Sequence, residues 1–417
     1  AILYPAIMGA LATIVMFFIG RELYDTRAGL FSAFFLAVIP AFITRTSAGF
    51  FDKEPTFGMM MLLTVFFFIA AFKRSSWKLG IFAGVFLGLT NMTSGLGTYV
   101  YIFLFLFAFI LLILNRHKQL LYSYGPATIV ASIIQFLAPK TNNDSIFYMI
   151  FLGVFAIFVL REGLERFKLV KEEDYKYIVP GLIILAVVGL LIGTIFFEYL
   201  FQLMNGLVTV LFVLNPSPIG YTVAEQQPGN LNSIVGVSGL GFSNRVLPQL
   251  EVFTQSFNFG GLPIPGLLSI FFFVILGIIV IVGKLGYSVY KKRFKESDFI
   301  LFLPLLWAIA SIWGVFLFIR LTFLFGPPAA LMGGIFIGWL IKKMLSLQNY
   351  ERLKQLKQVS KYMPIYILII VGLIVSINAA NAFGYVQGLG PSICVVNPEI
   401  LIDGERCLDV NPDGSIT

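Results

Sequence analysis

The chain has 417 residues, of which 58% are hydrophobic, only 12% are charged and 45 are phenylalanine. Its mean hydropathy of +0.91 is too high for a soluble domain, so the composition predicts a polytopic helical membrane protein. The net charge of +8 does not indicate a nucleic-acid-binding protein, because the basic residues recur in short loops and are not gathered on one polar domain.

Apolar runs of spanning length follow one another along the chain and predict an all-α fold with about twelve transmembrane helices. The expected helices cover residues 3–24, 28–46, 55–73, 77–94, 96–114, 121–137, 145–162, 177–198, 264–288, 299–318, 321–342 and 362–380.

A short polar segment separates the second of these runs from the third, and it contains Arg45, Asp52, Lys53 and Glu54. Four charges within ten residues are costly beside hydrocarbon unless they pair, bind an ion or face water. Asp52 and Glu54 are two positions apart, close enough to share a divalent cation. Pro55 suits the first turn of the helix that follows. A plain solvated turn is the alternative interpretation of this segment.

The basic residues predict the orientation of the chain in the membrane. When the expected helices alternate in direction, six of the 29 Lys and Arg residues fall on one side and the remaining 23 on the other. The six are Arg45, Lys53, Lys140, Arg245, Arg320 and Arg406. Because cytoplasmic loops are enriched in Lys and Arg, Asp52 and Glu54 are expected on the extracytoplasmic side.

The longest stretch without a predicted helix, residues 199–260, is expected on the same outer side. Loops of this length are usually functional or disordered. Within it, Thr222-Val-Ala-Glu225 carries the one carboxylate between Glu198 and Glu251. A solvated loop residue is the alternative interpretation of Glu225.

Two further features lie toward the C-terminus. Gly326-Pro-Pro328 is expected to break a helix just after Arg320, either as a plain kink or as a cavity wall that holds this arginine inward. The two cysteines, Cys394 and Cys407, lie in a polar tail, where they are expected either to pair or to remain free thiols.

These motifs, in this order and on one expected face, resemble the catalytic subunit of asparagine-linked oligosaccharyltransferase, the family of eukaryotic Stt3, archaeal AglB and bacterial PglB. Arg45 seven residues before Asp52-Lys-Glu54 is similar to the family's second acidic motif. Thr222-Val-Ala-Glu225 looks like its Thr/Ser-x-x-Glu loop motif, and Arg320 before a proline-containing helix is similar to its lipid-phosphate arginine. The resemblance is archaeal-like and covers nearly the whole chain.

The resemblance implies a GT-C-type glycosyltransferase core over residues 1–384 and the start of a truncated extracytoplasmic domain over residues 385–417. The family's first acidic motif and its Trp-Trp-Asp-Tyr-Gly motif have no counterpart in this sequence. We therefore expect a fragment that is inactive alone, in the cell membrane of an archaeon or bacterium or in the endoplasmic reticulum membrane of a eukaryote.

The implied reaction transfers an oligosaccharide from a polyprenyl-(pyro)phosphate lipid to the side-chain amide of Asn in Asn-x-Ser/Thr sequences. Asp52, Glu225 and Arg45 would be catalytic. Asp52, Glu54 and Glu225 would hold Mg²⁺ or Mn²⁺, because hard cations take oxygen ligands, and the absence of His and Cys from this set of residues argues against zinc. Arg320 would bind the donor phosphate.

Two other functions remain open from the sequence. One is a different polyprenyl-phosphate-sugar-dependent glycosyltransferase of the same fold, acting on O-linked or lipid acceptors. The other is a transporter or non-catalytic membrane scaffold. The expected partners are the lipid-linked donor, an acceptor polypeptide and membrane lipids, and not nucleic acid.

Overall fold

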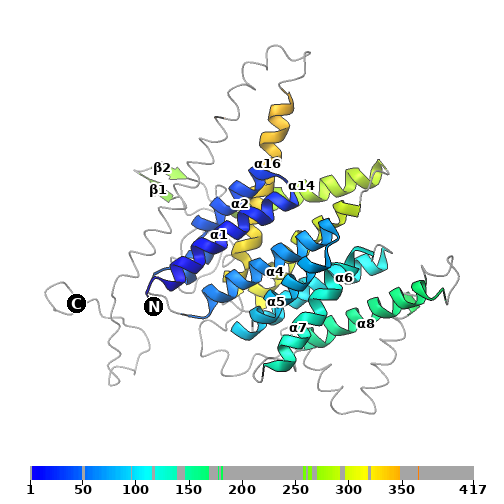
Figure 1. The fold of residues 1–417 in the computed structure, drawn as a ribbon. Helices are drawn as coiled ribbons and strands as arrows, with labels where there is room; N and C mark the ends of the chain where they lie inside the picture. The colour runs from blue at the N-terminus through cyan, green and yellow to red at the C-terminus, as the bar shows by residue number, and fades with distance from the viewer. Residues whose placement is uncertain are drawn as a thin grey trace, which may run out of the picture.

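The computed structural model describes residues 2–48, 52–94, 96–114, 118–138, 146–168, 257–259, 262–264, 270–291, 296–317 and 321–347, together with residues 177, 180, 181 and 365. Almost all of these residues are helical, which confirms the predicted helical architecture (Figure 1). The N-terminal helices α1 and α2 lie at one side of the bundle and α7 and α8 at the other (Figure 1).

The α-helices are α1 (Tyr4–Leu23), α2 (Thr26–Val38), α3 (Pro40–Thr46), α4 (Glu54–Arg74), α5 (Trp77–Thr93), α6 (Gly97–Ile113), α7 (Tyr124–Leu137), α8 (Ile146–Arg166), α14 (Ile270–Tyr290), α15 (Phe302–Leu317) and α16 (Thr322–Leu347). Two 3-10 helices, η1 (Lys118–Leu121) and η5 (Glu296–Leu301), precede α7 and α15. Strands β1 (Phe257–Phe259) and β2 (Leu262–Ile264) form an antiparallel hairpin that the sequence did not predict.

Four helical stretches in the described part of the chain are long and apolar enough to cross a membrane: Tyr4–Leu23, Glu54–Arg74, Lys118–Leu137 and Phe323–Lys343. Twelve spans are thus not confirmed. Most of the expected helices at 177–198 and 362–380, most of the loop at 199–260 and all of the tail at 385–417 lie outside the described residues.

The outer surface of α1 has the character of a lipid-facing helix. Its exposed apolar side chains, Ile7, Leu11 and Ile14, recur at intervals of four and three residues and so share one face. Its buried face, including Ala12, Met16 and Ile19, packs into the hydrophobic core of the bundle. A helix with apolar side chains on both its inner and outer faces is typical of a membrane span.

The single helix predicted over residues 28–46 is in fact two helices, α2 and α3. Ile39, between them, has an extended backbone with φ −74° and ψ 121°. Pro40 disfavours the helical conformation for the residue before it, and it then occupies the first turn of α3. The break makes α3, which carries Arg45 in its last turn, a separate short helix.

The break predicted at Gly326-Pro-Pro328 is wrong, because α16 is continuous from Thr322 to Leu347 with Pro327 and Pro328 inside it. Proline in a helix interior removes a backbone hydrogen bond. Here the flanking residues, from Phe323 to Met332, are fully or almost fully buried, so tertiary packing maintains the helix.

Small residues bring α16 and α2 into close contact. A Cβ atom added to Gly338 would lie 2.9 Å from the backbone nitrogen of Ala28. Gly20 of α1 packs in the same way against α2, where an added Cβ would lie 2.8 Å from Cα of Gly29. Such contacts let membrane helices gain van der Waals energy over long stretches.

Candidate active site at the start of α4

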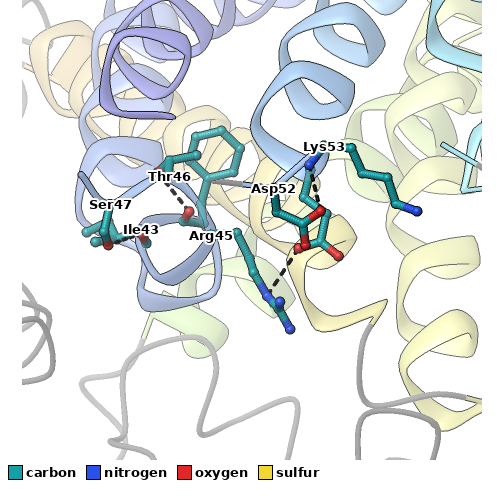
Figure 2. A network of polar contacts seen from close by, with 8 residues as sticks. Ile43, Arg45, Thr46, Ser47, Asp52 and Lys53 are labelled. Atoms are coloured by element: carbon teal, nitrogen blue, oxygen red, sulfur yellow. Dashed lines mark hydrogen bonds and ion pairs between the residues drawn. The ribbon is translucent and has the colours of Figure 1, made fainter. Parts of the chain in front are cut away.

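The end of α3 is shaped by its own hydroxyl side chains. Thr46 Oγ1 donates to the carbonyl oxygen of Phe42 at 2.9 Å, and Ser47 Oγ donates to that of Ile43 at 2.7 Å (Figure 2). These bonds occupy carbonyl groups of the last turn, which have no partner within a helix that ends here. They fix the last turn of α3, which contains Arg45.

The start of α4 carries the acidic residues. Glu54 is its first residue and Pro55 lies in its first turn, as the sequence predicted. Asp52 Oδ1 accepts a hydrogen bond of 2.6 Å from the backbone nitrogen of Lys53. Both carboxylates therefore lie at the positive end of the α4 dipole, which favours negative charge.

Arg45 and Glu54 join the two helix ends. Arg45 Nε lies 3.2 Å from Glu54 Oε2, and the side chain of Glu54 is 1% exposed while that of Arg45 is 19% exposed. Figure 2 shows the arginine pointing toward the start of α4 and the side chain of Lys53 pointing away from it. The predicted role of Arg45, neutralising an acidic cluster, is consistent with this ion pair. Asp52 is partly exposed.

Aromatic side chains pack together beside the start of α4. The rings of Phe42 and Phe323 are stacked, with centroids 5.3 Å apart and planes inclined by 9°. A Cβ on Gly58 would lie 2.8 Å from the ring of Phe323. The absence of a side chain at this position therefore leaves room for the two rings to pack against α4. The start of α16 is therefore packed against the end of α3 and the first turns of α4.

A hydrogen bond ties the start of α1 to the start of α4. The hydroxyl oxygen of Tyr4 lies 2.6 Å from Oγ1 of Thr56. Sequence reasoning identified neither residue. No local signal connects side chains 52 positions apart, although a tyrosine at the edge of an apolar run is typical of a membrane interface.

The structure thus brings together Arg45, Asp52 and Glu54. Glu225 and Arg320, the other two predicted site residues, lie outside the described residues, as do Cys394 and Cys407. Among the residues that are described, no group of three or more His, Cys, Asp and Glu side chains is arranged to hold a metal ion.

Comparison with known families identifies the family of this chain. The model of the family described as oligosaccharyl transferase STT3, N-terminal, matches residues 1–381. The chain belongs to the STT3 family. It is an integral membrane protein, since members of this family are membrane-embedded and the described part of the chain contains four helices long and apolar enough to cross a membrane.

Among eukaryotic relatives, the STT3B subunit of the dolichyl-diphosphooligosaccharide–protein glycosyltransferase of Arabidopsis thaliana is 39% identical over 90 residues, which are 21% of this chain and 12% of that protein. The corresponding STT3 subunit of Saccharomyces cerevisiae is 28% identical over 144 residues, or 33% of this chain and 20% of that one.

The fold matches a solved structure of the archaeal oligosaccharyltransferase AglB from Archaeoglobus fulgidus, in complex with an inhibitory peptide and a dolichol-phosphate. The TM-score is 0.64 and the identity 20%, and the match covers 91% of this chain and 44% of that one. A structure of the same archaeal enzyme in complex with Zn and sulfate matches with a TM-score of 0.59 and 18% identity, covering 91% of this chain and 40% of that one. The STT3-family chain described here therefore spans less than half the length of these relatives.

Proposed function

We propose that the protein containing this chain transfers an oligosaccharide from a polyprenyl-(pyro)phosphate lipid to the side-chain amide of Asn in Asn-x-Ser/Thr sequences. The observation that carries the proposal is the convergence of Arg45, Asp52 and Glu54 at the start of α4, in a chain that matches the STT3 family over residues 1–381. The archaeal structure holds an inhibitory peptide and a dolichol-phosphate, which supports a peptide and a polyprenyl phosphate as the two classes of ligand.

The reaction forms a bond between the amide nitrogen of Asn and the first sugar carbon, and it breaks the bond from that carbon to the phosphate oxygen. The amide nitrogen is a poor nucleophile because its lone pair is conjugated with the carbonyl group. Carboxylates that accept hydrogen bonds from the amide N–H groups can orient this nitrogen and take up the proton it loses. We assign this part to Glu225 together with Asp52.

Asp52 and Glu54 have different parts in this scheme. Asp52 is partly exposed at the start of α4, so its carboxylate can be reached by a metal ion and substrate. Glu54 is buried against Arg45, which keeps the acidic segment ordered and compensates its negative charge. We therefore assign direct metal ligation to Asp52. Glu54 is assigned either as a further ligand or as a carboxylate that supports the ligands.

The oxygen donors of Asp52, Glu54 and Glu225 fit Mg²⁺ or Mn²⁺. Such an ion, when bound, supplies Lewis-acid stabilisation of the negative charge on the departing phosphate. A structure of the related archaeal enzyme contains Zn, so zinc is the alternative ion for this site.

We assign the donor phosphate to Arg320. The support comes from the neighbouring residues: Phe323, three positions after Arg320, stacks on Phe42, three positions before Arg45. The start of α16, just after Arg320 in the sequence, thus lies close to the end of α3, which carries Arg45. A guanidinium group can form two parallel hydrogen bonds to a phosphate, which suits this task.

The distribution of basic residues supports an extracytoplasmic site. α4 begins at Glu54 and ends at Lys73 and Arg74. Its 21 residues span about 31 Å, the thickness of the hydrocarbon core, so the two ends lie at opposite membrane surfaces. The basic end belongs with the Lys/Arg-rich cytoplasmic loops.

The proposal is tested with purified full-length protein, a lipid-linked oligosaccharide donor and a fluorescent peptide containing Asn-x-Thr. We expect a slower-migrating glycopeptide that disappears when Asn in the peptide is replaced by Gln. Asp52→Ala should lower turnover by about 100-fold or more, the scale of losing a metal ligand or a transition-state contact. Lys53→Ala is the matched control, because this exposed neighbour points away from the pair, and it should leave turnover within about threefold of wild type. Equal activity of the two variants would overturn the assignment.

A further inference from the structure

Basic side chains converge on Tyr24 at the end of the bundle opposite the Arg45–Glu54 pair. Tyr24 follows the last residue of α1. Lys284 Nζ, from α14, lies 5.1 Å from the centroid of its ring, and Lys342 Nζ, from α16, lies 5.9 Å from it. Both distances are within the range of cation–π attraction. Two ammonium groups from separate helices therefore share one aromatic ring.

Lys284 lies among three other charged side chains. Burial disfavours the charge of its ammonium group, the carboxylate of Asp298 in η5 attracts it, and Lys342 and Lys73 repel it. This one carboxylate faces three ammonium groups, so positive charge is in excess. Within the part of the chain that the structure describes, neither Lys284 nor Lys342 forms a salt bridge. Like charges placed this close at a membrane interface favour an anion from outside the protein.

The other acidic groups of this region are already engaged. Glu22 pairs with Arg74, with Oε2 and Nη2 3.0 Å apart, and its carbonyl oxygen accepts a hydrogen bond from Lys73. Asp25 caps α2 by accepting a 2.8 Å hydrogen bond from the backbone nitrogen of Ala28. Burial and the negative charge of Asp25 raise the pKa of the Tyr24 hydroxyl, so this phenol stays neutral and keeps a proton to donate.

The surface beside the cluster is apolar. Leu276 and Val280 of α14 are partly exposed apolar residues, and they precede Lys284 by eight and four positions, so they form an apolar stripe on the same face of the helix as this lysine. A phosphate group bound by the lysines would have this stripe next to it, on the hydrocarbon side. That combination fits a phospholipid, whose phosphate and acyl chain are covalently joined, better than a soluble phosphate.

We propose that Lys284, Lys342 and Tyr24 form a binding site for an anionic phospholipid of the leaflet opposite the glycosyl-transfer site. The phosphodiester lies between the two ammonium groups and accepts a hydrogen bond from the Tyr24 hydroxyl, and an acyl chain follows the partly exposed stripe of Leu276 and Val280 on α14. Charge complementarity selects a lipid with net negative charge over a zwitterionic one. This site is separate from the proposed activity and does not depend on it.

The test measures lipid binding to delipidated full-length protein by native mass spectrometry, with phosphatidylglycerol and phosphatidylcholine of the same acyl chains. Wild type should retain phosphatidylglycerol preferentially. The double variant Lys284→Gln/Lys342→Gln should lower the affinity of the first bound phosphatidylglycerol by about 30-fold, the scale expected for two interfacial basic residues. Its affinity for phosphatidylcholine should not change, which also shows that the variant is folded.

The matched control is Lys78→Gln/Lys291→Gln. Each of these lysines lies 6.0 Å from the ring of the residue directly before it, Trp77 or Tyr290, and the two share no ring. The control removes the same amount of charge and should leave the first site unchanged. Equal losses in the two double variants would overturn the proposal in favour of general surface attraction. Displacement of the bound lipid by millimolar inorganic phosphate would overturn it in favour of a soluble anion.

Discussion

Arg45 Nε and Glu54 Oε2 lie 3.2 Å apart. In this ion pair the side chain of Glu54 is almost completely buried, while that of Arg45 is partly exposed. The pair connects the end of α3 to the start of α4. Because an uncompensated buried carboxylate is costly, we expect the arginine to stabilise this connection.

Replacing Arg45 by Met should therefore destabilise the protein. We expect a loss of about 2 kcal/mol, below the 3–5 kcal/mol typical of a fully buried pair, because Arg45 is partly exposed. A thermal melt of the full-length protein in detergent measures the effect as a lower apparent Tm. The matched control is Arg74→Met at the other end of α4, where the arginine of the pair with Glu22 is 53% exposed and the loss should stay below about 1 kcal/mol. Equal shifts in Tm would contradict the structural role given to Arg45.

The close contact of α2 with α16 predicts a steric effect. Gly338→Val should lower the apparent Tm by several degrees, because its Cβ would lie 2.9 Å from the backbone nitrogen of Ala28. Gly283→Val on α14 is the control, since an added Cβ there meets no atom within 4 Å. If the two variants have the same apparent Tm, α2 and α16 are not packed as closely as described.

The assignment of Arg320 to the donor predicts a particular kinetic pattern. Arg320→Ala should raise the KM for the lipid-linked donor at least tenfold, and saturating donor should restore part of the turnover, because guanidinium–phosphate pairing stabilises the ground state as well as the transition state. The defect of Asp52→Ala should not respond to donor concentration. Initial rates over a donor titration separate the two, and equal, donor-insensitive losses would remove Arg320 from this task.

The sequence predicted a large part of this arrangement. The expected helix over residues 55–73 is observed as Glu54–Arg74, because a long apolar run, a proline in the first turn and basic residues in the last turn all favour these ends. The charge pattern also placed Lys73, Lys284 and Lys342 on one side, and the structure brings them to one end of the bundle.

Other features depend on contacts between distant segments. The two prolines in α16 predicted a break by local rules, but the burial of their neighbours outweighs the local preference. The sequence could not decide which carboxylate pairs with Arg45, since Asp52 and Glu54 are both within reach until the start of α4 fixes their directions. The ring of Tyr24, just after α1, is shared by lysines from α14 and α16, and no local sequence pattern indicates this contact.

The central claim is that Asp52 and Glu225 belong to one catalytic centre, and chemical cross-linking in the full-length protein tests it most directly. Cys394 and Cys407 are first replaced by Ser, and Asp52→Cys is combined with Glu225→Cys. A control pairs Asp52→Cys with Lys73→Cys, which α4 separates by about 30 Å. We expect a short bismethanethiosulfonate reagent to cross-link the first pair in the presence of donor and acceptor peptide and not to cross-link the control. Failure of the first pair to cross-link, with all single cysteines labelled equally well, would contradict the account.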